Sequence, residues 1–257
     1  MRTADLFRRL LTPVLLLFAA GCAAIPVVTD PASAAELTAF TAAMDQAAGT
    51  GRTICTTQRY TYAGSLAELN IPIRLTVCWR NDPPGYSESL QVEGMPLKKM
   101  VYNGTVCREI IDEIGSRALP PAERESLLIG WRMLDWRTTF AEAFSELAID
   151  REIVEINGVA CRRLVGRFKA APSLEPVEFF VSVNDKLIRR TRTVAVTDLG
   201  RIPVTIDHLD YRLQHGVMLP AHMIMEQLGT RLELRLENWE FDPRLPDETF
   251  TIAEDEI

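Results

Sequence analysis

Histidine is scarce in this chain, and the motifs that carry most enzymatic chemistry are absent. Only His208, His215 and His222 occur among 257 residues. No G-x-S-x-G, H-E-x-x-H, Walker loop or dinucleotide-binding glycine pattern occurs, and no two cysteines have C-x-x-C spacing. The sequence places no nucleophile beside a base. We therefore expect a protein that is not an enzyme and that uses no cofactor and no metal.

Positive charge is in deficit. The chain has 28 Lys and Arg against 35 Asp and Glu, a net charge of -7. An acidic surface repels nucleic-acid phosphates and anionic lipids, so we expect no nucleic-acid partner. The 47% hydrophobic share is that of an ordinary globular protein with room for one large domain.

Long apolar runs are missing except near the N-terminus. Three arginines precede an apolar run at residues 10–20, which is too short to span a bilayer and ends in Ala19-Ala20-Gly21-Cys22. Small residues before such a cysteine resemble the lipobox of bacterial lipoproteins. The resemblance implies a signal peptide at residues 1–21 and a lipid, such as palmitate, on Cys22. The alternative is an ordinary secretory signal that is cleaved nearby.

Four other cysteines remain, in an exported protein where disulfides persist. Cys55 and Cys78 lie on the polar sides of two predicted strands, where a cross-strand disulfide is plausible; the same register places Arg59 unfavourably opposite Arg74. Cys107 and Cys161 belong to apolar rows. They are either buried free thiols or a second disulfide.

Most of the chain alternates apolar and polar residues with period 2, which predicts strands. The clearest block is 201–250, where Leu232, Leu234 and Leu236 alternate with charged residues. A three-residue turn ending at Gly216 would place Leu213 opposite Val217. Two-residue turns at Asn103-Gly104 and Asn157-Gly158 would place Met100 opposite Cys107 and Val154 opposite Cys161.

Two segments have helical periodicity. Ser33 and Glu36 predict a capping box for an N-terminal helix after a tether at 22–34. Between the strands, residues 119–150 predict one helix to Ile129 and a second containing Phe140, Ala143, Phe144 and Leu147. The expected fold class is α+β. One strongly curved antiparallel sheet of ten to twelve strands forms an incomplete β-barrel, and the N-terminal helix and helical insert cover its concave apolar face.

The predicted register also places His208 opposite His222 on the polar face. His215 then lies in the turn, beyond reach of a shared metal ion. A two-histidine site with Asp210 or Glu226 is one interpretation, and exposed surface histidines are the other.

With these elements in order, the chain resembles the bacterial lipoprotein-carrier superfamily, the outer-membrane lipoprotein-sorting proteins of the LolA and LolB type. The resemblance is carried by Asp210-Tyr211-Arg212, Gly216 to Pro220, Glu237-Asn238 and Leu245 to Phe250, with the turns at Tyr102-Asn103-Gly104 and Asn157-Gly158-Val159. It spans residues 35–250 and leaves an acidic tail at 251–257.

The resemblance implies a hydrophobic cavity that holds a lipid or the acyl part of a lipoprotein, in a protein anchored in the outer membrane and facing the periplasm. The expected cavity residues are Trp131, Leu134, Trp136, Phe140 and Phe144 in the insert and Leu213, Leu219, Met223, Met225, Leu232 and Leu234 on the sheet. Two alternatives stay open: the same side chains form a dry core, or the fold serves as a peptide- or protein-binding envelope sensor or scaffold.

Overall fold

The computed structural model describes residues 28–49, 56–67, 69–133 and 139–252, with the backbone alone at 130–133. The signal peptide, Cys22, Cys55, Leu134, Trp136 and most of the acidic tail lie outside the described residues, as does the side chain of Trp131.

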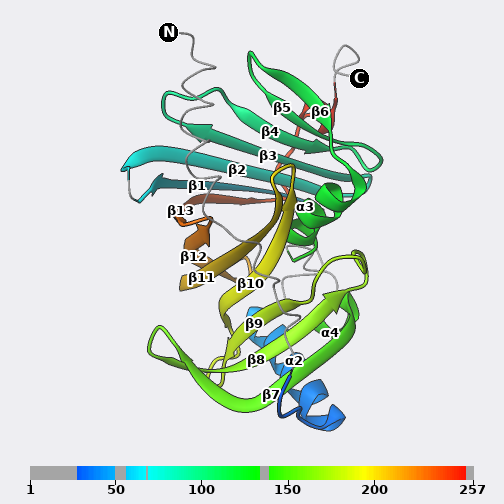
Figure 1. Ribbon diagram of the computed structural model, residues 1–257, viewed down its shortest axis with the longest axis vertical. Helices are drawn as coiled ribbons and strands as arrows, with labels where there is room; N and C mark the ends of the chain where they lie inside the picture. Colours follow the sequence, from blue (N-terminus) through cyan, green and yellow to red (C-terminus); the bar gives the residue numbers. More distant parts are fainter. Residues whose placement is uncertain (1–27, 50–55, 68, 134–138, 253–257) are drawn as a thin grey trace.

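One antiparallel sheet contains all the described strands, in the order β6-β5-β4-β3-β2-β1-β13-β12-β11-β10-β9-β8-β7 (Figure 1). Their bounds are β1 Thr57–Leu66, β2 Ile71–Asn81, β3 Pro84–Val92, β4 Lys98–Tyr102, β5 Cys107–Ile111, β6 Gly115–Ala118, β7 Phe144–Ile156, β8 Val159–Phe168, β9 Val177–Ser182, β10 Ile188–Thr197, β11 Gly200–Gln214, β12 Val217–Gln227 and β13 Thr230–Phe241. The strands β6 and β7 at the two ends of this order do not pair with each other, so the sheet is open and does not close into a barrel. The predicted fold class is confirmed, with 13 strands in place of ten to twelve.

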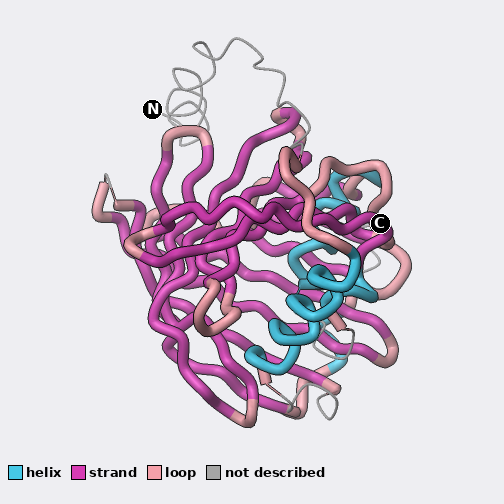
Figure 2. Tube along the Cα trace, turned by 90° about the horizontal axis from the view of Figure 1, so that it is seen from below, coloured by secondary structure: helices cyan, strands magenta, loops and turns pink. Residues whose placement is uncertain are grey.

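The helices gather on one side of the bent sheet (Figure 2). They are α2 Ala34–Ala48, α3 Pro121–Met133 and α4 Phe140–Ala143, followed by a 3-10 turn at Asp247–Phe250. The predicted Ser33–Glu36 capping box is confirmed at α2. We call the face that packs against α2, α3 and α4 the inner face, and the opposite one the outer face.

Two hydrophobic clusters lie on the inner face. One joins Phe40 and Met44 of α2 to Phe144, Leu164 and Phe179. The other joins Leu127 and Leu128 of α3 to Tyr60, Trp79 and Leu234. The helical insert therefore covers the apolar face of the sheet, as predicted.

The second predicted helix of the insert is wrong beyond its first turn. Thr139 and Glu142 form a capping box, but α4 ends at Ala143, and Phe144 and Leu147 lie on β7. Two side chains three residues apart share a helix face but not the face of a regular strand. In β7 the register shifts between Phe144 and Glu146, and this irregularity lets both Phe144 and Leu147 lie against Gly166 of β8.

Three predicted registers are wrong and one is confirmed. His215 and Gly216 both have positive φ and form a two-residue turn, so Gln214 opposes Val217. In β1, Arg59 opposes Cys78 and not Arg74. In β4, Tyr102 and not Met100 opposes Cys107, because the loop has four residues. Val154 opposes Cys161 as predicted.

Cys78, Cys107 and Cys161 are buried free thiols. Cys107 belongs to β5 on the inner face, whereas Cys161 packs against Phe180 in a small cluster on the outer face. The second disulfide is therefore ruled out in favour of two buried thiols. Burial raises the pKa of Cys107 to about 12, so its thiol stays protonated.

Candidate functional site

A single row of inner-face side chains crosses nine neighbouring strands. Strand pairing aligns Ile149, Leu164, Phe179, Thr191, Ile206, Met225, Leu232, Leu66 and Ile71, from β7 to β2. All but Thr191 are apolar. Because neighbouring strands lie about 4.8 Å apart, the row spans roughly 38 Å.

Burial divides this row into two halves. From β7 to β10 the side chains are covered: Leu164 and Phe179 are 0% exposed, and Ile149 and Thr191 are 1% exposed. From β11 to β2 the five remaining members are only partly buried. We call Ile206, Met225, Leu232, Leu66 and Ile71 the open half-row.

The helices explain the difference. The cluster that covers the first half contains Phe40 and Met44 of α2 and the half-buried Phe140 of α4. Helix α3 also contributes the buried Ile129 to this cluster. Its Leu127 and Leu128 contact the other cluster, and its Ser126 Oγ accepts a hydrogen bond from the Val196 N–H at 2.9 Å. The open half-row is left with less cover than its apolar character favours.

The strand positions next to the open half-row continue the apolar surface. Met223 opposes Leu234, which opposes Gly64, on the same face. Leu234 is 1% exposed, and Met223 is half-buried. A Cβ at Gly64 would lie 1.7 Å from the carbonyl oxygen of Glu233, so β1 and β13 approach closely only because residue 64 is glycine.

His208 lies on this apolar surface and not on the polar face. It opposes Met223, and its Nε2 lies 3.0 Å from Thr191 Oγ1. Burial lowers the pKa of His208 to about 4, and the nearby Asp207 carboxylate opposes this only in part. The imidazole is therefore neutral near pH 7.

The predicted pairing of His208 with His222 is wrong. His222 opposes Leu209, so the two rings lie on opposite faces of the sheet. On the outer face, His222 Nε2 is 2.9 Å from a Glu233 oxygen and Nδ1 is 3.6 Å from Asp210. Within the described residues, no three histidine, cysteine or acidic side chains converge on a metal-sized site.

The predicted cavity residues separate into three groups. Leu219 and Leu234 are buried, and Met223, Met225 and Leu232 are half-buried on the inner face. Phe140 and Phe144 pack into the cluster under α2, with ring centroids 4.9 Å apart. Leu213 is 68% exposed near the β11–β12 turn, because the one-residue change of register moves it to the outer face.

Several residues of the open half-row were not predicted. Ile206, Leu66 and Ile71 are not among the predicted cavity residues, and the predicted β11 register would place Ile206 with His208 on the polar face. A two-residue hairpin turn at His215-Gly216 was the signal that would have placed Ile206 correctly.

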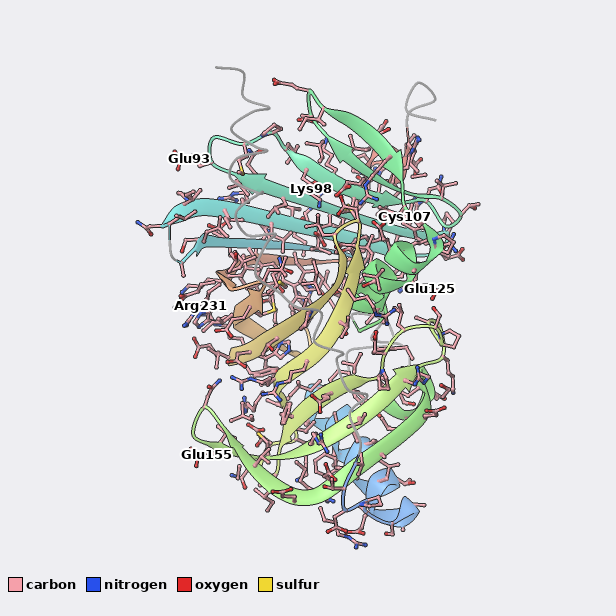
Figure 3. All side chains as sticks on the ribbon, in the orientation of Figure 1. Glu93, Lys98, Cys107, Glu125, Glu155 and Arg231 are labelled. Carbon is pink, nitrogen blue, oxygen red and sulfur yellow. The ribbon has the colours of Figure 1, made fainter. Side chains whose placement is uncertain are left out.

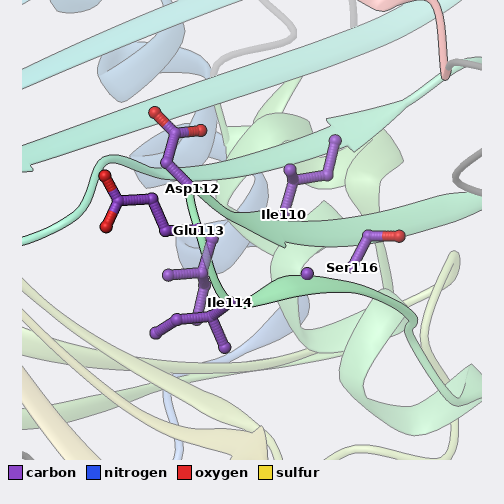
Figure 4. A pocket seen from close by; sticks show the side chains of 7 residues that line it. Ile110, Asp112, Glu113, Ile114 and Ser116 are labelled. Carbon is purple, nitrogen blue, oxygen red and sulfur yellow. The ribbon is translucent and has the colours of Figure 1, made fainter. Parts of the chain in front are cut away.

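A separate open hollow of about 490 Å³ lies at the tip of the β5–β6 hairpin (Figure 4). It is lined by Ile110, Ile111, Asp112, Glu113, Ile114, Gly115 and Ser116. None of the predicted cavity residues contributes to it.

No family model matches the chain, and no curated protein matches it by sequence. Solved structures do match. A DUF1329 family protein from Desulfovibrio piger has a TM-score of 0.55 and 12% identity, over 87% of this chain and 98% of that one. A LolA superfamily protein from Nitrosomonas europaea has a TM-score of 0.53 and 13% identity, over 84% of this chain and 97% of that one.

The resemblance to the LolA superfamily is thus confirmed for the fold. At such low identities the likeness shows the fold alone, and a fold does not by itself determine a function. Among the described residues no helix combines the length and apolarity that a membrane crossing needs.

Proposed function

We propose that this chain is a non-enzymatic, lipid-anchored protein of the outer membrane. It faces the periplasm and binds a lipid or the acyl chain of a lipoprotein along its inner face. Its role is in lipoprotein sorting or lipid traffic. The observation that supports this most is the open half-row: five aligned apolar side chains, from Ile206 to Ile71, that the helices leave partly uncovered.

The dimensions suit an acyl chain. Five strands at about 4.8 Å spacing give a strip roughly 19 Å long, comparable with an extended long-chain acyl group. Each methylene moved from water onto this strip contributes about 0.8 kcal/mol. Met223 and Met225 have unbranched, adaptable side chains that can repack around chains of different length.

The helical insert serves as the cover. Leu127 and Leu128 of α3 contact the apolar surface beside the open half-row. Movement of the insert would uncover more of that surface for a ligand. Trp131, Leu134 and Trp136 are proposed as lid residues, and Phe140 and Phe144 as its fixed base.

The test is binding of a fluorescent fatty acid to the full chain. The double variant Met225→Asn with Leu232→Asn makes the open half-row polar and is expected to weaken binding at least tenfold, about 1.4 kcal/mol. Leu213→Asn is the matched control, because Leu213 is exposed on the outer face. Equal loss in both variants, or no binding by the wild type, would contradict the proposal.

A second readout identifies the natural ligand. Lipid extracted from protein purified out of its native envelope and analysed by mass spectrometry should contain an acyl species. The same analysis of the double variant should show it depleted.

A further inference from the structure

Four neighbouring hairpins have their turns at the same end of the strands. In the strand order, β6-β5, β4-β3, β2-β1 and β13-β12 are adjacent pairs, and all neighbouring strands from β6 to β12 are antiparallel, both within and between these hairpins. The four turns that close these hairpins therefore lie side by side. Figure 3 shows Glu93 of the β3–β4 turn and Arg231 beside the β12–β13 turn on the same side of the molecule, with Cys107 on the other.

Each of these turns exposes one large hydrophobic side chain. Leu69 is 66% exposed, Met95 38%, Ile114 62% and Leu228 39%. Single exposed hydrophobic residues are normal on protein surfaces, but here each of four consecutive hairpins places one at the same end of the sheet. We call Leu69, Met95, Ile114 and Leu228 the tip line.

The charged side chains described on these four turns are all acidic. They are Glu93, Asp112 and Glu113, and none of them forms an ion pair among the residues that the structure describes. Two of the three, with Ile114, line the 490 Å³ hollow at the β5–β6 tip (Figure 4). The hollow can thus accept a side chain with an apolar stem and a cationic end.

The spacing of the tip line matches a helix. Successive hairpins repeat every two strands, or about 10 Å. In an α-helix, residues seven apart on one face are separated by about 10.5 Å. Four tips therefore match a helix of roughly 22 residues with an apolar residue at every seventh position.

We propose that the tip line is a docking surface for a cationic amphipathic helix of a partner protein. The apolar residues of the helix would contact the four tips, and its Lys or Arg residues would face Glu93, Asp112 and Glu113. The acidic turns disfavour an anionic membrane as the occupant, since like charges repel. This proposal does not depend on acyl-chain binding.

The test uses a synthetic helix of roughly 22 residues, with Leu at every seventh position and Lys and Ala elsewhere, titrated into the full chain. The variant Leu69→Ser, Met95→Ser, Ile114→Ser, Leu228→Ser is expected to bind it at least tenfold more weakly. All four sites are exposed, so the fold should be retained. Val106→Ser with Leu213→Ser is the matched control, because these residues are 43% and 68% exposed at the opposite end of the sheet.

Charge is tested separately. Glu93→Gln, Asp112→Asn, Glu113→Gln should weaken binding and reduce its salt dependence, and a peptide with Glu in place of Lys should not bind the wild type. Equal loss in the control variant, or equal binding of the Glu peptide, would overturn the proposal. So would tip-line-dependent binding to phosphatidylglycerol vesicles without binding to the Lys peptide, which would identify a membrane as the occupant. Met225→Asn with Leu232→Asn should leave peptide binding unchanged.

Discussion

The carboxylate of Asp150 fixes the N-terminal segment to the edge of the sheet. It is 4% exposed, accepts hydrogen bonds from the Thr29 and Asp30 N–H groups at 3.0 and 3.2 Å, and lies 2.6 Å from the Arg163 guanidinium. Removing this carboxylate would leave the Thr29 and Asp30 N–H groups without their acceptor. Arg163 would lose one of its two carboxylate partners and keep Glu178.

Asp150→Ala is therefore expected to lower the free energy of unfolding by about 2 to 4 kcal/mol, measured by urea denaturation. Glu146→Ala is the matched control. Its carboxylate is 74% exposed and 3.5 Å from Arg167, so its loss should change stability by less than about 0.5 kcal/mol. Similar effects of the two variants would show that Asp150 is not a buried junction.

His208 should make stability depend on pH. Its folded-state pKa of about 4 lies below the ordinary 6.5, so the unfolded chain binds more protons between these values. Stability from this residue is present above pH 6.5 and is lost as the pH falls towards 4. His208→Gln removes the titrating group and offers Thr191 an amide. Acidification from pH 7 to 4 should cost the wild type up to about 3 kcal/mol more than the variant, and parallel stability curves would contradict this.

Among the elements, β7 shows how far apolar spacing can mislead. Phe144 was assigned to a helix, yet it begins β7 and packs against Phe168 and Phe179 with ring centroids at 4.4 and 5.7 Å. Phe144→Ala should lower the free energy of unfolding by about 3 to 5 kcal/mol in thermal or chemical denaturation. Ile153→Ala, at a 60% exposed position of the same strand, should cost less than about 0.5 kcal/mol. A small effect at Phe144 would show that this aromatic cluster is loosely packed.

The alternation of side chains predicted which segments are strands, but it could not predict how they pair. Alternation has a period of two, so a slip by an even number leaves every side chain on its face. The errors at Arg59 and at Cys107 were of this kind and kept those residues on the correct faces. The predicted register of β11 against β12 differs from the observed one by a single residue. Leu213 therefore lies on the outer face and His208 on the inner face, the reverse of the prediction.

The sheet as a whole is open, and its two edges are protected differently. At one end β6 has only four residues, and Arg117 on it contacts both Glu109 and Glu123. At the other end, the N-terminal segment lies along β7. The Ala32 N–H donates to the Ile149 carbonyl, and the Arg151 N–H donates to the Asp30 carbonyl, both at 2.9 Å. Short or covered edges hinder pairing with other chains. The predicted tether of residues 22–34 is thus tied to the domain from Thr29 onward.

This attachment limits how far the domain can lie from a membrane if Cys22 carries the lipid. Seven Cα–Cα steps separate Cys22 from Thr29, which gives at most about 25 Å. The strand β7 and helix α2 would then lie near the bilayer, and the β5–β6 hairpin, at the far end of the long axis, would lie away from it (Figure 1). Energy transfer from dyes at Glu155→Cys and Asp112→Cys to acceptor lipids should be stronger at residue 155.

Two variants separate the causes of this orientation. Cys22→Ala should abolish transfer at both positions, because the chain would leave the membrane fraction. Asp150→Ala removes the acceptor of the Thr29 and Asp30 N–H groups but keeps the backbone hydrogen bonds of Ala32 and Arg151. It should therefore loosen the start of the segment and reduce the difference between the dyes while keeping the protein at the membrane. Equal transfer from both positions in the wild type would contradict a fixed orientation. It would mean that the contacts at Asp150 open on the membrane, so that the inner face is not held at one distance from its lipid source.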